Sequence, residues 1–208
     1  MTAIVRVVHS VEKNPALLRQ IEPIIFPVLM HSLTPDGLDA IEDGIDIINC
    51  MIYHGTGPEA PISSEMWKLF PQILHITAGQ ESDVDGGFAF EYLSNVTTCV
   101  QNYIVKGSET LMTVGPNQQQ SYFHLTCNFI QRVLVINAAG YNKQDGISAM
   151  RLVMTILEKF PGMIDDSLPN LVAIMLAELK KAFDEPDTPP NYRSMLLQAF
   201  SMCFYNNC

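Results

Sequence analysis

A short proline-containing signature recurs along the sequence at a nearly constant spacing. It occurs three times, in Glu22–Phe26, Phe70–Leu74 and Leu168–Val172. Pro71 follows Pro23 by 48 residues, and Pro169 follows Pro71 by 98, which is two steps of 49. The omitted step falls at Gln120, where an amphipathic stretch begins without a proline. Self-similarity at about 40 to 50 residues is typical of stacked repeats, each of which buries its apolar face against its neighbours.

Apolar residues between the prolines follow the period of an α-helix. The clearest case is the helix predicted over Pro35–His54, which Thr34 caps and in which Pro35 occupies the first turn. Its apolar stripe has the three- and four-residue spacing of one helical face and consists of Leu38, Ile41, Ile45, Ile48 and Ile52. Similar capped stretches predict about nine helices and no strand, paired antiparallel into about four repeats. The predicted fold is all-α, an α-solenoid that spans residues 1–208 as a single domain.

Cysteine usage and hydropathy indicate a protein without disulfides or membrane spans. The five cysteines, an odd number without close pairing, indicate free thiols in a reducing compartment. The N-terminal apolar run is interrupted by Arg6 and is too short for a secretory signal. The longest uncharged stretch, Thr110–Gln131, contains four glutamines, a proline and a glycine, so it is too polar to span a bilayer.

Acidic residues are concentrated in one part of the chain. Between Gln20 and Val105 there are twelve acidic residues and one basic residue, Lys68, so this segment carries a formal charge of −11 while the whole chain carries −10. A negative field of this kind disfavours direct binding to nucleic acid or anionic membranes and favours basic proteins. The alternative interpretation is that the acidic residues only keep the protein in solution.

Two pairs of potential metal ligands lie on predicted helices, Cys50 with His54 and His124 with Cys127. A structural zinc site needs four ligands, and no second pair lies near either of these in the sequence. The loop Asp83–Gly87 resembles the start of a calcium loop, but phenylalanines replace the later ligands. Phosphate-binding and hydrolase motifs are absent from the sequence. We therefore expect no enzymatic activity, no catalytic residues, no cofactor and no bound metal.

Several runs resemble one protein family. The helix pairs resemble HEAT repeats, and the run Ile62–Ile73, which contains Met-Trp-x-Leu-Phe-Pro, resembles a repeat in the C-terminal half of importin-β superfamily receptors. Further runs fit the same region: Phe90–Ser94, Asn102–Ile104, Ser108–Leu111 and Leu196–Asn207. The resemblance covers most of the chain from about Asn14 onward, and it is greatest to the importin-seven/eight receptors, which carry proteins into the nucleus.

The resemblance implies a nuclear transport receptor segment that binds protein cargo for import and moves between cytoplasm and nucleus. Receptors of this family are several times longer, and this chain begins within a repeat and ends without a polar cap, so we expect a fragment of a longer receptor. Ran-GTP would bind mainly to N-terminal repeats of the full-length receptor, and Phe-Gly nucleoporins would bind apolar grooves between helices. The alternative function is a non-catalytic HEAT-repeat scaffold for complex assembly, such as a phosphatase regulatory subunit, which the same repeats would support.

A cargo-binding face is predicted on the helix Pro35–His54, because the second helix of each pair lines the concave face in solenoids that resemble importins. If its apolar stripe faces the core, five carboxylates lie together on the opposite edge: Asp36, Asp39, Glu42, Asp43 and Asp46. Like charges at this spacing repel one another, and a cationic partner would reduce the repulsion. We therefore expect this face to bind Lys/Arg-rich segments of basic cargo, such as ribosomal proteins or histones. A solvated helix face without a partner is the alternative.

Overall fold

The computed structural model of the chain describes residues 1–57, 60–80, 83, 86–116, 118–139, 144–162 and 168–205. These residues form ten α-helices and two short 3₁₀ helices, and the β-pairing among them is confined to two isolated bridges. The all-α prediction is confirmed. No helix in the described part of the chain has the length and apolar character needed to cross a membrane. The chain divides into two compact units, Met1–Leu125 and Thr126–Cys208, and the prediction of one continuous domain stays a prediction.

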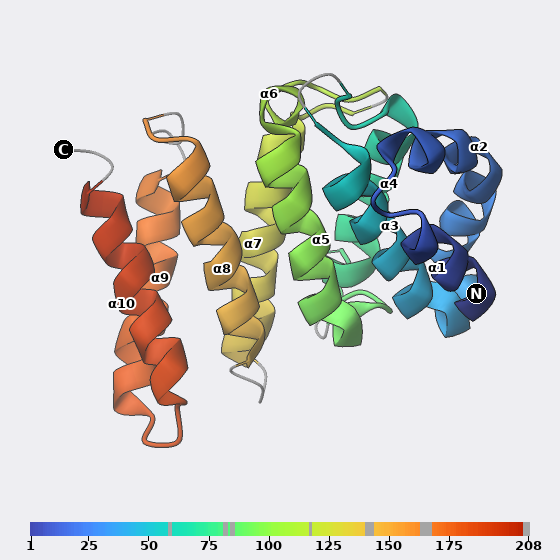
Figure 1. Cartoon of the computed structure of the whole chain (residues 1–208). Helices are drawn as coiled ribbons and strands as arrows, with labels where there is room; N and C mark the ends of the chain where they lie inside the picture. The colour runs from blue at the N-terminus through green and yellow to red at the C-terminus, as the bar shows by residue number, and fades with distance from the viewer. Residues whose placement is uncertain are drawn as a thin grey trace. The chain divides into compact units, whose positions relative to one another are not determined.

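The N-terminal unit contains two helix pairs, preceded by one helix and followed by a short one (Figure 1). In chain order its elements are α1 (Thr2–Ser10), α2 (Pro15–Ser32), the 3₁₀ helix η1 (Pro35–Ala40), α3 (Ile41–Gly55), α4 (Ser64–Ala78), η2 (Phe90–Tyr92), α5 (Leu93–Lys106) and α6 (Ser108–Leu111). Helix α2 packs on α3, α4 packs on α5, and the second helices α3 and α5 pack on each other. Contact between equivalent helices of consecutive pairs is the arrangement of HEAT-like repeats.

The C-terminal unit repeats this contact between second helices. Helix α7 (Tyr122–Ala139) leads into it, and α8 (Gln144–Lys159), α9 (Leu168–Asp184) and α10 (Pro190–Tyr205) follow. Helix α10 packs on both α8 and α9. The Tyr192 hydroxyl donates a hydrogen bond of 3.0 Å to Glu178 Oε2, and Arg193 donates to the backbone oxygens of Ala182 and Glu185 at 2.7 and 2.8 Å. These bonds connect the start of α10 to the end of α9.

The repeated proline signature marks the first helix of three pairs. Pro23 and Pro27 lie inside α2, Pro71 lies inside α4, and Pro169 lies in the first turn of α9. Each internal proline removes one backbone hydrogen bond and favours a bend in the helix. At the step without a proline, α7 begins at Tyr122. The signature therefore falls on the first helix of each of these pairs, near the middle of α2 and α4 but in the first turn of α9.

Capping residues set the ends of the helices. The Asn14 side chain accepts a hydrogen bond of 3.2 Å from the backbone N–H of Leu17 at the start of α2. Ser63 caps α4 in the same way, through the backbone N–H of Met66 at 3.1 Å. Helix α4 ends at Gly79, whose φ of 69° lies in the left-handed region that glycine adopts without steric cost. The sequence therefore specifies these boundaries locally.

Aromatic side chains fill the core between α4, α5 and the start of α7. The Trp67 ring lies 4.6 Å from the Tyr122 ring and 5.1 Å from the Tyr103 ring, measured between centroids. Phe70 lies 4.7 Å from Tyr103. Tyr103 is fully buried, and its hydroxyl donates a hydrogen bond of 2.6 Å to the backbone oxygen of Met66. Trp67 is buried, and the hydroxyl of Tyr103, the one polar atom of its side chain, is satisfied.

The helix predicted over Pro35–His54 is divided in the structure. Its first six residues form η1, and the α-helix begins at Ile41. Leu38, the first residue of the predicted stripe, is half-buried, whereas the other four are fully buried. The prediction of one α-helix is wrong for Pro35–Ala40, because Gly37 is a poor helix former and approaches α2 so closely that a Cβ there would lie 2.1 Å from the His31 backbone oxygen.

Candidate functional site

The five carboxylates predicted to bind cargo are divided between two elements. Asp36 and Asp39 lie on η1, and Glu42, Asp43 and Asp46 lie on the first two turns of α3. Residues three apart eclipse in a 3₁₀ helix, so Asp36 and Asp39 share one side of η1. Asp36, Asp39 and Glu42 are exposed, whereas Asp43 and Asp46 are half-buried. We call Asp36, Asp39 and Glu42 the acidic edge.

The side chains of the acidic edge make no hydrogen bond or ion pair with the described part of the chain. Glu42 lies in the first turn of α3, where a negative charge interacts favourably with the partial positive charge of the helix N-terminus. Helix stability therefore explains part of the acidic composition. Asp36 lies in the first turn of η1, where the same interaction applies, whereas Asp39 lies near the end of η1.

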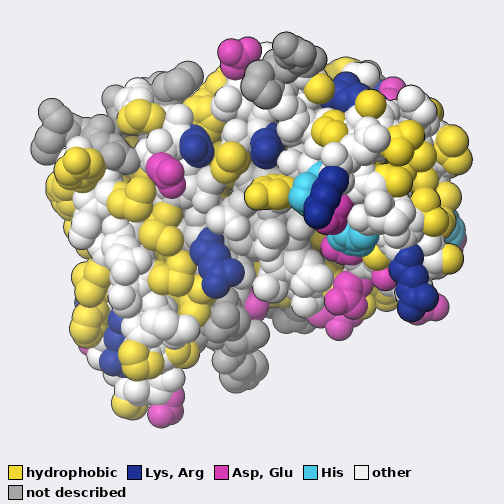
Figure 2. Space-filling view, viewed as in Figure 1, with side chains coloured by type: hydrophobic (Ala, Val, Ile, Leu, Met, Phe, Trp, Pro, Cys, Tyr) yellow, Lys and Arg dark blue, Asp and Glu magenta, His cyan; other side chains and the backbone are white. Residues whose placement is uncertain are grey.

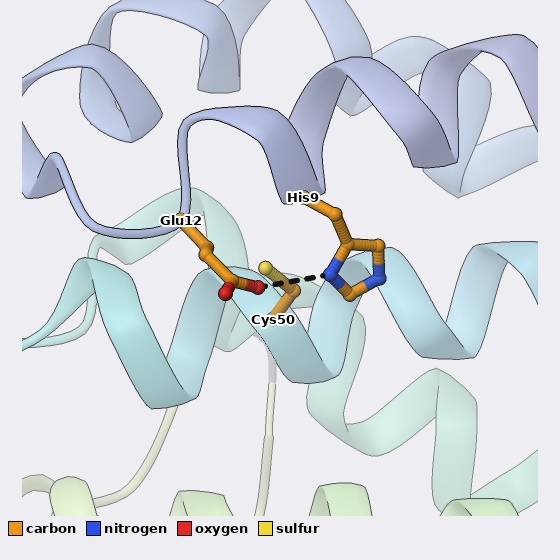
Figure 3. Close-up of side chains that lie close together, drawn as sticks. All are labelled: His9, Glu12 and Cys50. Carbon is orange, nitrogen blue, oxygen red and sulfur yellow. Dashed lines mark hydrogen bonds and ion pairs between the residues drawn. The ribbon is translucent and has the colours of Figure 1, made fainter.

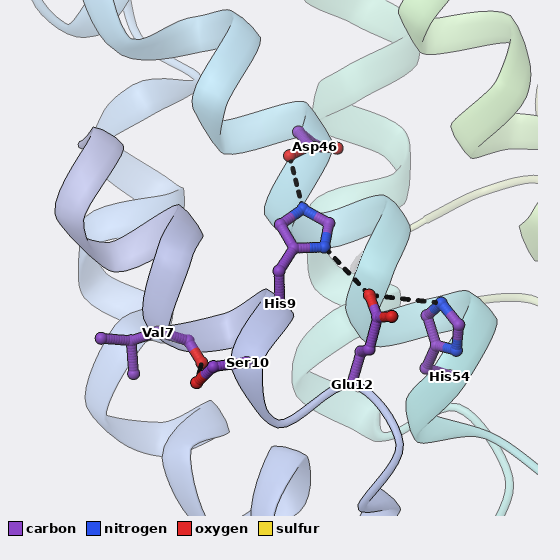
Figure 4. Close-up of polar contacts among 6 residues, drawn as sticks. All are labelled: Val7, His9, Ser10, Glu12, Asp46 and His54. Atoms are coloured by element: carbon purple, nitrogen blue, oxygen red, sulfur yellow. Dashed lines mark hydrogen bonds and ion pairs between the residues drawn. The ribbon is translucent and has the colours of Figure 1, made fainter.

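Asp43 and Asp46 differ from the acidic edge because each has a partner from α1. The Thr2 hydroxyl donates to Asp43 Oδ2 at 3.4 Å. The His9 ring lies between two carboxylates, with Nε2 2.8 Å from Asp46 Oδ2 and Nδ1 3.1 Å from Glu12 Oε2 (Figure 4). His9 therefore connects α3 to the turn that follows α1.

A second histidine and a cysteine from α3 complete this group. Oε2 of Glu12 lies 3.9 Å from Nε2 of His54, and Figure 3 shows the Cys50 sulfur beside the Glu12 carboxylate and the His9 ring. The ligand atoms of His9, Glu12 and Cys50 all lie within 4.8 Å of one another. We call His9, Glu12, Asp46, Cys50 and His54 the histidine–carboxylate cluster. Such a set of side chains can hold a proton or a metal cation.

The cluster changes the pKa values of its members. Hydrogen bonds to Asp46 and then to Glu12 raise the pKa of His9 above the ordinary value of a histidine. The hydrogen bond from His9 lowers the pKa of Glu12. Burial, followed by the charges of Glu12 and Asp46, raises the pKa of the Cys50 thiol to about 11. Cys50 is therefore a protonated thiol at neutral pH in the metal-free protein, without the reactivity of a thiolate.

Sequence reasoning identified Cys50 and His54 as a possible pair of ligands but missed His9 and Glu12. The available signal was the three-residue spacing of His9 and Glu12 at the end of α1, which can place two side chains on one face of a helix. That spacing is common and carries little information by itself. Packing of α1 on α3 brings the two pairs together, and this tertiary contact has no local signature in the sequence.

The other predicted ligands do not form a similar group. His124 is exposed and Cys127 is half-buried, and among the described residues no third ligand lies with them. Asp83 accepts a hydrogen bond of 2.7 Å from the backbone N–H three residues before it, which is a structural role in the turn. Glu81 and Asp85 lie outside the described residues.

An open pocket of about 280 Å³ adjoins the histidine–carboxylate cluster. Its walls include Asn49 and Tyr53 of α3 and Thr98 and Asn102 of α5. Asn102 Nδ2 donates to Asn49 Oδ1 at 2.5 Å, and the Lys106 ammonium lies 5.1 Å from the centroid of the Tyr53 ring. In Figure 2, histidine and acidic side chains lie side by side on the N-terminal unit. The pocket connects the cluster to solvent.

Comparison with known proteins aligns the whole chain with much longer ones. It is 26% identical over 208 residues, 100% of its length, to the importin beta-like SAD2 homolog of Arabidopsis thaliana, of which it covers 18%. It is 21% identical over 201 residues, 96% of its length, to the probable importin-7 homolog of Dictyostelium discoideum, of which it covers 17%. The chain thus spans less than a fifth of the length of these curated relatives. No protein-family model and no solved structure matches it significantly.

Proposed function

We propose that this chain is a cargo-binding segment of a nuclear transport receptor. The premise is membership of the importin-β superfamily, which is supported by the alignment of nearly the whole chain with two importin-like relatives. Its paired and stacked helices agree with this family, since helical repeats present extended surfaces to other macromolecules. Neither relative is named as an enzyme. The proposed receptor imports protein cargo and moves between the cytoplasm and the nucleus.

The acidic edge is the observation that carries the proposal. Its three carboxylates are exposed on consecutive elements and have no side-chain partner within the described residues. The formal charge of −11 between Gln20 and Val105 adds a longer-range attraction for cations. Because a lysine or arginine can approach these carboxylates without displacing another group, the geometry favours a basic protein segment as the ligand.

Asp43 and Asp46 take a secondary role in the proposed cargo-binding set. Each already interacts with a side chain of α1, Thr2 in one case and His9 in the other. A cargo lysine would have to replace His9 at Asp46, whereas it can approach Asp39 directly. The contribution of Asp46 to cargo affinity is therefore smaller than that of Asp39.

Ran-GTP and Phe-Gly nucleoporins are proposed partners of the full-length receptor. The chain covers 18% and 17% of its two relatives, so most of the repeats of such a receptor lie outside it. No residue of the chain is assigned to either partner. Particular side chains, those of the acidic edge, are proposed to bind cargo only.

Removal of the charges of the acidic edge tests the proposal. The triple variant Asp36→Asn/Asp39→Asn/Glu42→Gln should bind a Lys/Arg-rich peptide several-fold more weakly than the wild type at low salt. Exposed ion pairs are worth about 0.2–1 kcal/mol each, and about 1.4 kcal/mol corresponds to a tenfold change in affinity. Fluorescence anisotropy of the labelled peptide measures the dissociation constant, which should also rise with salt because the charges are screened.

A control variant separates a specific surface from general charge attraction. Glu158→Gln/Asp184→Asn/Asp187→Asn removes the same number of exposed charges from the C-terminal unit. Its affinity for the peptide should stay close to that of the wild type. Equal losses in the two variants, or an unchanged affinity in the acidic-edge variant, would contradict the proposal. Circular dichroism of both variants confirms that helicity is retained.

A further inference from the structure

The histidine–carboxylate cluster brings together side chains of the kinds that bind zinc. His9 and Glu12 come from the end of α1 and the turn after it, and Cys50 and His54 come from α3. Imidazole nitrogen, thiolate sulfur and carboxylate oxygen are the usual protein ligands of Zn²⁺. The expectation of no metal site rested on two ligands close in sequence, and folding places two more beside them.

The distances within the cluster suit one shared ion. Two nitrogen or oxygen ligands in a tetrahedral zinc site lie about 3.3 Å apart, because each lies about 2.0–2.1 Å from the metal. His9 Nδ1 and Glu12 Oε2 are 3.1 Å apart, and the sulfur of Cys50 completes a set whose atoms lie within 4.8 Å of one another. His54 Nε2 is 3.9 Å from Glu12 Oε2. His54 lies outside this set of three, and rotation of its partly exposed ring would bring it to the ion as the fourth ligand.

Asp46 orients His9 for this role. A histidine that binds zinc usually donates its other ring N–H to a carboxylate, which fixes the tautomer and the direction of the ring. His9 Nε2 lies 2.8 Å from Asp46 Oδ2, which leaves Nδ1 facing Glu12 (Figure 4). An ion bound to Nδ1 and to the Glu12 carboxylate would replace the proton that these two groups share.

Burial and access also agree with an ion site. Cys50 is 5% exposed, whereas the side chains of His9, Glu12 and His54 are 40%, 32% and 35% exposed. The adjoining pocket includes His9, Cys50 and His54 in its walls. An ion can therefore enter from solvent and meet a sulfur ligand that is held rigidly by α3.

We propose that His9, Glu12, Cys50 and His54 bind a zinc ion, with Asp46 as the positioning residue for His9. The ion joins α1 to α3 and fixes the N-terminal helix on the first helix pair. The zinc ligands are separate from the acidic edge, and Asp46 is the one residue that the two proposals share. Either proposal can fail without the other.

Zinc titration and X-ray absorption of the wild-type chain test the site directly. Chain stripped of metal with a chelator and titrated against a chromophoric zinc indicator should bind one zinc ion. The absorption spectrum of the zinc-loaded chain should require one sulfur at about 2.3 Å together with nitrogen and oxygen ligands at about 2.0–2.2 Å. No binding in competition with the indicator, or a bound ion without a sulfur ligand, would overturn the proposal.

Variants assign the ligands. Cys50→Ala should remove the sulfur contribution, and Asp46→Asn should lower the zinc affinity about 10- to 100-fold, with a larger loss in His9→Gln. His75→Gln and Cys127→Ala change the same residue types at positions that are not members of the cluster and should leave the affinity unchanged. His9 is partly exposed, so His9→Gln remains informative if Cys50→Ala does not fold. Wild-type affinity in both His9→Gln and Asp46→Asn would overturn the assignment.

Discussion

The acidic edge and the histidine–carboxylate cluster both include residues of α3 but differ in the surroundings of their carboxylates. Asp36, Asp39 and Glu42 face solvent without a side-chain partner among the described residues. Asp46 and Glu12 lie beside histidines at 2.8 and 3.1 Å. The first region has charge available for another molecule, whereas the second uses its charge within the chain.

This difference shows that the formal charge of a segment overstates the charge available to a partner. In the sequence, Asp39, Asp43 and Asp46 form a regular row at helical spacing. In the structure, α1 covers one end of the row, and the other end lies on η1. A carboxylate that already has a cationic neighbour gains less from a second cation, because the first must be displaced.

The largest expected effect concerns α3, which supports both regions. Ile48 is fully buried on this helix, and Ile48→Ala should lower the free energy of unfolding by about 2–5 kcal/mol, because the lost methyl groups leave a cavity in the core. Urea denaturation followed by circular dichroism measures the change. If both regions depend on the position of α3, peptide affinity and zinc affinity should fall together in this variant.

The control for this prediction is Ile24→Ala, since Ile24 is 73% exposed on α2. This substitution should change the free energy of unfolding by less than about 0.5 kcal/mol. A similarly small change in Ile48→Ala would show that α3 is not held by the packing described here.

A smaller effect distinguishes the two regions themselves. In chelator-treated protein, Asp46→Asn removes the charged partner of His9 and should lower the free energy of unfolding. The side chain of Asp46 is 45% exposed, so solvent screening limits the loss to about 0.2–1 kcal/mol. Asp39→Asn removes an exposed charge that has only like-charged neighbours on η1 and α3, and should leave the stability unchanged or raise it slightly.

Thermal unfolding of the two single variants under identical buffer conditions makes this comparison. Equal destabilisation by Asp39→Asn and Asp46→Asn would remove the distinction between the regions. An unchanged stability in Asp46→Asn would also remove this distinction, because the contact between Asp46 and His9 would then contribute nothing to the free energy of unfolding.

Much of the fold follows from local signals in the sequence. Thr34 occupies the expected N-cap position, although its side chain makes no capping hydrogen bond. The proline spacing identified the first helices α2, α4 and α9, and the side chains of Asn14 and Ser63 cap two of them. These features depend on residues within a few positions of one another, so a single sequence contains them. The break at Pro35–Ala40 was missed because it depends on the close approach of Gly37 to α2.

The candidate sites were less accessible from the sequence. The five carboxylates could be identified by their spacing, but their separation into partnered and unpartnered groups depends on α1. His9 and Glu12 reach Cys50 only through the packing of α1 on α3. Contacts between segments about 40 residues apart leave no periodic pattern, so a single sequence does not reveal them.

The most direct test of the central claim is to map where a basic peptide binds. Titration of ¹⁵N-labelled chain with a Lys/Arg-rich peptide should shift the amide resonances of residues 36–43, with smaller shifts around Asp46 and none in α9 and α10. The shifts should disappear in the Asp36→Asn/Asp39→Asn/Glu42→Gln variant. Shifts centred on the C-terminal unit, or an unchanged pattern in this variant, would contradict the assignment of the acidic edge as the cargo-binding surface.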